Sequence, residues 1–313
     1  MHTWIQDAPT GVYKNHALSS RMREAAIEKS VFMDHVSPEE GFGKNKGESI
    51  TITRIANIAE PTSPVLSETE RIPEDTFTLS TTSITALEIG RSVPYTSLSR
   101  DLSAYDIDNP IQKKLLQQLQ LSLDTMIADA FKSCQVKYTP TGLTSNNIAT
   151  NGTFGATATV NMNLYHVEEI YDYMYDTLHT PTVDGDYIGI FRHASIRGIM
   201  RDPEWIEWHK YTNPTAKFNG EVGKLENIRF IDTNHADALS EVGTGSVLGE
   251  GVVFGDDAIV MAEVMAPELL ADENKGGDFG RQKAVAWYGI LNFGEPFPTG
   301  NPGEARIVHV GSL

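Results

Sequence analysis

Glycine clusters are the first features of this sequence that could do chemistry, because backbone N–H groups in glycine loops can hold a phosphate. One stretch, NGEVGKLENIRFIDTN, carries Gly220 and Gly223 just before an apolar run. Residues 243–255 hold five more glycines, but their spacing misses the dinucleotide fingerprint by one residue. The better prediction is a set of turns, with Gly220 and Gly223 letting the backbone turn tightly into the strand candidate ENIRFI.

The nine histidines raise the question of a metal site. His166 lies close to two glutamates, but no second histidine follows four residues later on the same predicted helix. His193, His209 and His235 share no metal-ligand spacing. Scattered histidines of this kind are usually surface or hydrogen-bonded residues, so neither a metal nor another cofactor is predicted.

Cys134 is the single cysteine, which rules out an intrachain disulfide and a cysteine-rich zinc site. It falls at the end of a predicted helix with no recognisable histidine partner, and the chain has no Gly-x-Ser-x-Gly motif. No catalytic residue is therefore predicted. An uncharacterised metal-dependent enzyme that uses the histidines stays open as an alternative.

Net charge and hydropathy limit the classes of partner that this chain could bind. The 313 residues include 25 Lys and Arg against 42 Asp and Glu, for a net charge of −17. Such a chain is repelled by duplex DNA and by anionic membrane surfaces. No run approaches the ~18 apolar residues of a membrane span, and the first residues do not resemble a signal peptide.

Several elements look incomplete on their own. A helical pattern over 19–32 is followed by a glycine- and proline-rich break. SITITRI and TFTLSTTSITALEI then alternate as strands, separated by a polar connection with three prolines and five acidic residues. This pattern predicts a projecting two-stranded arm, which needs a partner surface because an isolated ribbon is marginal in water.

A long helix follows, capped by Asp108, with Pro110 in its first turn and an apolar stripe continuing to Cys134. Residues 137–163 are rich in Thr, Asn and Gly and predict a boundary. The remaining elements are predicted from periodicity: helices over 164–178 and from about 194, and strands over 186–191, 258–264, 283–293 and 305–310.

The order of these elements resembles the major capsid protein of tailed bacteriophages, with the α+β Hong Kong 97-type fold. The likeness is closest to the N4-like podovirus (schitovirus) coat proteins. It rests on YDIDNPIQKKLLQQLQLSLDTMIADAF, GDYIGIFRHASIRGIMRDPEWIEWHKYT, FNGEVGKLENIRFIDTN and AVAWYGILNFGEP, and spans residues 19–310. The implied division is an N-terminal arm (1–47), an extended loop (48–80), a peripheral domain (81–136) with a spine helix (107–134), an axial domain (137–250), and strands returning to the peripheral domain (251–313).

The resemblance implies a structural protein of the virion, not an enzyme. Hexamers and pentamers would form an icosahedral shell around double-stranded DNA, which is enclosed without sequence-specific binding. Assembly is expected in the bacterial host cytoplasm, without a membrane, and with a portal and decoration proteins. No scaffolding segment is visible before the arm, so a separate scaffolding protein is expected. An encapsulin-like compartment shell is the alternative with the same fold.

Subunit contacts are expected at two places. The acidic end of the extended loop, with Glu68, Glu70 and Arg71, is predicted to touch a neighbouring subunit. Gly220 and Gly223 are predicted to position an axial-domain strand near the symmetry axis of a capsomer.

Overall fold

The computed structural model describes residues 26–39, 42–58, 60–61, 64–66, 68, 71–103, 108–203, 205, 221–239, 249–277 and 279–312. The helix predicted over 19–32 lies outside these residues up to position 25. Residues 26–32 are not helical, and a short 3-10 helix, η1 (Met33–His35), follows them. The amides of Val31 and Phe32 bond to a side chain of another helix instead of a preceding helical turn.

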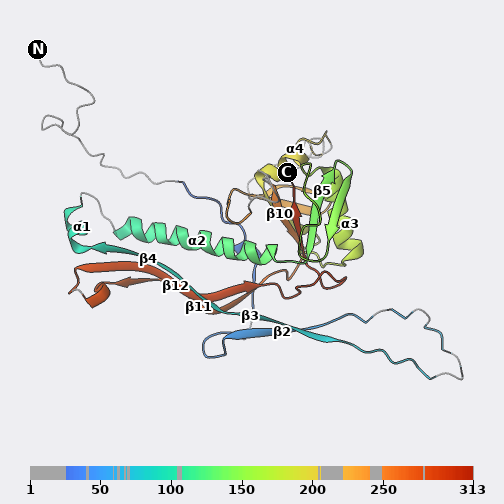
Figure 1. Ribbon diagram of the computed structural model, residues 1–313, viewed down its shortest axis with the longest axis horizontal. Helices are drawn as coiled ribbons and strands as arrows, with labels where there is room; N and C mark the ends of the chain where they lie inside the picture. Colours follow the sequence, from blue (N-terminus) through green and yellow to red (C-terminus); the bar gives the residue numbers. More distant parts are fainter. Residues whose placement is uncertain are drawn as a thin grey trace, which may run out of the picture.

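An elongated body is formed by a long helix lying along a four-stranded sheet (Figure 1). The helix is α2 (Asp108–Lys132), which confirms the predicted rod. The sheet order is β1 (Ser37–Pro38), β11 (Val260–Asp272), β12 (Gln282–Gly294) and β4 (Leu87–Thr96). Leu115 and Leu119 from α2 pack against Val285 and Trp287 of β12, so the predicted apolar stripe is a core-facing surface.

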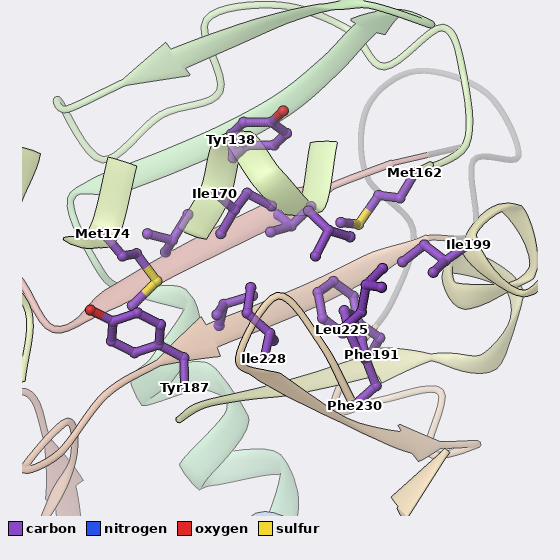
Figure 2. Close-up of a cluster of buried hydrophobic side chains, with 14 of the residues drawn as sticks. Tyr138, Met162, Ile170, Met174, Tyr187, Phe191, Ile199, Leu225, Ile228 and Phe230 are labelled. Carbon is purple, nitrogen blue, oxygen red and sulfur yellow. The ribbon is translucent and has the colours of Figure 1, made fainter. Parts of the chain in front are cut away.

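A second body is built on a seven-stranded sheet. Its order is β6 (Ser145–Ala149), β5 (Val136–Gly142), β13 (Ile307–Gly311), β10 (Glu250–Phe254), β7 (Tyr187–Arg192), β9 (Ile228–Thr233) and β8 (Glu221–Leu225). The helical segments of this body are α3 (Leu164–Asp172), a π-helical turn η2 (Tyr173–Thr177) and α4 (His193–Met200). Figure 2 shows their shared core, where Met162, Ile170 and Met174 lie over Tyr187, Phe191 and Phe230.

The end of α2 joins the two bodies. Ile127 and Phe131 of α2 are fully buried with Phe32 and Phe254. The rings of Phe131 and Phe254 lie 4.6 Å apart between centroids, which is within the range for favourable aromatic contact. The long helix therefore belongs to both cores and fixes the seven-stranded sheet at its C-terminal end.

One sequence prediction needs correction here. After α2 ends at Lys132, the chain enters the seven-stranded sheet through the β5–β6 hairpin, so it passes from one body to the other near the start of residues 137–163. Residues 251–313 were expected to return to the peripheral domain. The strands β11 and β12 do lie in the four-stranded sheet, but β10 and β13 lie in the seven-stranded sheet, where β13 pairs in parallel with β5. All five residues of each of these two strands are buried, and central strands of this kind lack the alternation that marks a sheet with one solvated face.

The predicted two-stranded arm is confirmed. β2 (Ser49–Ile55) pairs with β3 (Leu79–Thr85) in an antiparallel register from Ser49↔Thr85 to Ile55↔Leu79. The described residues between the two strands continue away from both bodies (Figure 1). Among the described helices, none is long and apolar enough to cross a bilayer.

Candidate assembly interface

The arm is anchored at its base by a small apolar cluster. Ile84 of β3 is buried with Val260 and Ala262 of β11, and Ile50 and Ile52 of β2 pack against this group. The alternation of isoleucine and threonine in β2 places Ile50 and Ile52 on one face of the ribbon. That face contacts the four-stranded sheet, so the root of the arm has a fixed direction.

Beyond this root, the arm displays apolar side chains to water. More than half of the surface is exposed in each of Ile55, Ile58, Val65, Leu66, Ile72, Phe77 and Leu79. A two-stranded ribbon has no second layer that could cover such residues. Exposed apolar groups gathered on one extension are typical of a surface that another molecule covers.

The predicted contact residues lie along the connection between the two strands. Glu68 is exposed. Arg71 is also exposed and forms an ion pair with Glu74, three residues along the chain. Glu70 lies outside the described residues. Exposed pairs of this kind contribute little to stability, so Arg71 has little that holds it in this position.

A second apolar surface lies at the opposite end of the elongated body, where α1 (Ser97–Leu102) meets the β11–β12 connection (Figure 1). Ser97 donates its amide to Arg281 O at 3.0 Å and its hydroxyl to Gly280 O at 2.9 Å. Leu98, Leu102 and Phe279 are exposed here, and Phe279 has a φ of +47°. A bulky residue in the left-handed region is uncommon and marks this tip as a tightly specified turn.

Gly223 does not form the predicted turn. It lies within β8, where it pairs with Phe230 of β9. The tight turn begins three residues further on, at Glu226 and Asn227, with φ values of +46° and +57°. Two successive left-handed residues give the two-residue hairpin turn that matches strand twist. Gly220 lies outside the described residues. In Figure 2 this hairpin lies beneath α3, with Leu225 and Ile228 on either side of its turn.

The second glycine cluster serves packing where the structure describes it. A Cβ on Gly251 of β10 would lie 1.9 Å from Cδ1 of Phe191 on the neighbouring strand β7. Only glycine leaves room for that ring in the core. No helix N-terminus follows this strand, so the described part of the cluster lacks the geometry of a phosphate loop.

His166, His193 and His235 each contact a polar side chain. His166 Nδ1 lies 2.9 Å from the Tyr138 hydroxyl, His235 Nδ1 lies 2.8 Å from Asp124, and His193 Nδ1 lies 3.3 Å from Asp232. His209 lies outside the described residues. Within the described part of the chain, no three His, Cys, Asp or Glu side chains are grouped to hold a metal ion.

A buried charged cluster escaped the sequence analysis. Lys137 Nζ lies 3.0 Å from His309 Nδ1, and His309 Nε2 lies 2.8 Å from Glu250 Oε1. Burial lowers the pKa of both Lys137 and His309. Burial also raises the pKa of Glu295 to about 8, although Lys137 and Arg54 act in the opposite direction. These residues come from four separate segments, so no local spacing could have revealed them.

Cys134 lies beside this cluster, and its surroundings disfavour the reactive thiolate form. Its thiol is buried and bonds to Val136 O at 3.3 Å. Burial raises the pKa of the thiol to about 12. Because the thiolate is the nucleophilic form, this cysteine does not act as a nucleophile near neutral pH.

The spine-like helix, the four-stranded sheet along it, the seven-stranded sheet at its C-terminal end and the extended ribbon together define the Hong Kong 97-type α+β capsid fold. Solved phage capsid structures share it over nearly the whole chain. The acid-stable capsid of Helicobacter pylori bacteriophage KHP30 matches with a TM-score of 0.68 and 14% identity, covering 95% of each chain. The cyanophage Pam1 capsid matches with a TM-score of 0.69 and 12% identity, covering 98% of this chain and 99% of that one. The Ralstonia phage GP4 capsid matches with a TM-score of 0.66 and 13% identity, covering 96% of each chain.

The amino-acid sequence matches no protein-family model and no curated protein at a significant level. With identities of 14% or less, the structural similarity establishes the fold. It confirms the predicted fold class independently of the sequence patterns.

Proposed function

We propose that this chain is a major capsid protein that assembles into the icosahedral shell of a tailed bacteriophage. The observation that carries the proposal is the match to phage capsid structures over 95% or more of the chain. The extended ribbon is the element of this fold that is least able to exist alone. His166 and His235 are hydrogen-bonded to neighbouring side chains, and the thiol of Cys134 is buried. These surroundings accord with a structural rather than a catalytic role.

The exposed apolar side chains of the arm support self-association. In a shell, the arm of one subunit would lie on its neighbour and cover residues such as Phe77 and Leu79. Glu68, Glu70 and Arg71 are proposed to contact that neighbour as well. Arg71 can exchange its exposed intrachain partner for a carboxylate of the adjacent subunit at little cost.

We propose the same division of the chain as in the capsid family. Residues 1–47 would form the N-terminal arm, which is separate from the two-stranded arm of β2 and β3. Residues 48–80 would form the extended loop, 81–136 the peripheral domain and 137–250 the axial domain. The strands after 250 divide between the two bodies, as β10 and β13 require. Hexamers and pentamers are the proposed capsomers, and the N4-like podovirus coat proteins are the proposed relatives.

The acidic balance fits a container for DNA. A net charge of −17 repels the phosphate backbone, so the genome is enclosed without being gripped. A separate scaffolding protein, a portal and decoration proteins are the proposed partners, and the host cytoplasm is the proposed place of assembly. A predominantly basic inner face on the assembled shell would contradict this account of DNA enclosure.

Negative-stain microscopy of the purified full-length chain tests the proposal. Closed shells, or rings of capsomers, are the expected particles, with coexpression of a scaffolding protein where shells are irregular. Small discrete particles under both conditions would overturn it. Nuclease-protected DNA in particles from the natural source would support a phage shell, whereas packaged protein would indicate the compartment alternative.

A further inference from the structure

Asp124 lies in the middle of α2 and is fully buried, with 0% of its surface exposed. Its Oδ1 atom accepts three hydrogen bonds from the segment before η1: the Ser30 hydroxyl at 2.8 Å, the Val31 amide at 3.0 Å and the Phe32 amide at 2.9 Å. Its Oδ2 atom lies 2.8 Å from His235 Nδ1, in the loop after β9. One carboxylate therefore holds two segments that are about 200 residues apart in the sequence.

His235 also contacts the N-terminal segment. It is 2% exposed, and its Nε2 atom lies 3.5 Å from Glu28 Oε2. The ring thus stands between a buried carboxylate on one side and a half-exposed carboxylate on the other. An open groove of about 520 Å³ reaches this contact and is lined by Glu28, Lys114, Gln118, His235 and Asp237. Water can therefore exchange protons with the Nε2 side of the ring.

We propose that Glu28, Asp124 and His235 form a proton-dependent clasp that holds residues 28–32 against α2. The protonated imidazole has an N–H on each nitrogen and can donate to both carboxylates at once. A neutral ring has one N–H, which the shorter contact to Asp124 retains. The Nε2 lone pair then faces the Glu28 carboxylate, and two acceptors oppose each other. Loss of the proton therefore releases the Glu28 side of the clasp and loosens the segment that follows.

Other polar groups also contact this segment or lie beside His235. Lys29 donates its amide to Asn234 Oδ1, and its ammonium lies 3.3 Å from Asp232 Oδ1. His193 contacts the other oxygen of Asp232 at 3.3 Å. Lys114 and Asp237 line the groove beside His235. His193 is a second imidazole beside this segment, and its side chain is 49% exposed, so it serves as an internal control.

Amide hydrogen exchange on the full-length chain tests the clasp directly. The amides of Val31 and Phe32 donate to Asp124 and follow Glu28 in the chain, so their protection reports on how firmly this segment is held against α2. We compare about pH 5.5 with about pH 8.5, on either side of the range in which an imidazole changes charge. After correction for the intrinsic pH effect on exchange, protection should be about tenfold greater at the lower pH, the factor expected for one charge-assisted hydrogen bond.

Variants separate this clasp from a passive contact. His235→Gln and Glu28→Gln should each abolish the pH dependence at Val31 and Phe32. His193→Gln should preserve it. Asp124→Asn should lower protection at both pH values. If that variant does not fold, His235→Gln and Glu28→Gln still distinguish the clasp from a passive contact. Equal protection at both pH values in the wild type, or a pH dependence that survives His235→Gln, would overturn the proposal. Because the measurement needs no assembled shell, its failure would leave the proposed capsid function untouched.

Discussion

Lys137 and His309 are side by side inside the seven-stranded sheet, with Lys137 Nζ 3.0 Å from His309 Nδ1. They come from the adjacent parallel strands β5 and β13, which are 172 residues apart in sequence. His309 also bonds to Glu250 on β10, on the other side of β13. Three neighbouring strands are thus linked by one line of charged side chains, and this arrangement makes stability depend on pH.

Acidification should weaken the fold through His309. Burial lowers its pKa in the folded state, so the unfolded chain takes up the proton first as pH falls. The stability that His309 contributes is therefore present above about pH 6.5, the ordinary pKa of histidine, and is lost as the pH falls below that value. Urea unfolding should show that His309→Gln costs about 1–3 kcal/mol at about pH 7.5 and progressively less below about pH 6. His193→Gln, at an exposed site, should show little of this trend. A penalty that stays constant with pH would contradict the assignment.

Glu295 should act with the opposite sign. Its pKa is raised to about 8 by burial, and its Oε2 atom has no hydrogen-bond partner among the described residues. The folded state therefore favours the protonated form, and stability is lost as pH rises from about 4.5 to about 8. Glu295→Gln should match the wild type near about pH 4.5 and exceed it by about 1–3 kcal/mol at about pH 8.5. The control is Glu268→Gln, an exposed site on β11. A variant less stable than wild type at the higher pH would show that the carboxylate is favourably paired.

A side chain at position 251 should disrupt the core. The added Cβ of Gly251→Ala would lie 1.9 Å from the Phe191 ring, which is fully buried. Overpacking of this kind costs about 1–3 kcal/mol and forces neighbouring side chains to move. Thermal unfolding should show the loss, and Phe191→Leu in the same chain should recover part of it. Gly276→Ala provides a comparison, since no atom lies within 4 Å of its Cβ and only its φ of +71° is unfavourable. A smaller effect at 251 than at 276 would be inconsistent with the observed contact.

The hairpin turn should depend on Asn227 rather than on Gly223. Asn227 has a φ of +57°, a conformation that β-branched residues strongly disfavour. Asn227→Val should destabilise the chain by about 1–2 kcal/mol, while Asn227→Gly should be nearly neutral. Denaturant titration of both variants distinguishes backbone strain from loss of the side chain. Equal losses in the two variants would mean that the amide, not the backbone, is what matters.

The apolar arm should matter for assembly but not for folding. Phe77 and Leu79 are 61% and 58% exposed, so replacing both with serine removes little buried surface from the single chain. Melting temperature should therefore stay close to wild type, while shell yield in sedimentation should fall severalfold. Leu143→Ser is the matched control, because this residue is 69% exposed on the β5–β6 turn, away from the arm. Normal shells from the arm variant would show that these arm residues are not part of the subunit interface.

Periodicity alone determined much of this protein. The helix over 108–132, the paired strands of the arm and the strands near 187–192 and 282–294 each follow from the spacing of their own apolar residues. The order of these elements carried the resemblance to phage capsid proteins, and that resemblance implied the capsid fold. Local patterns succeed for the helix and the arm because each of them buries one face, and the residues of that face recur at a regular spacing in the sequence.

Tertiary structure decided what depends on contacts between distant segments. The hairpin of β5 and β6 is rich in Thr and Asn, and its strand character comes from pairing with β13 rather than from its own hydrophobicity. The placement of β10 and β13, the close approach at Gly251 and the buried groups around Asp124 and His309 likewise arise only when strands and helices meet. Burial and charge pairing are properties of three-dimensional neighbours, so the sequence names these residues without showing which of them will lie together.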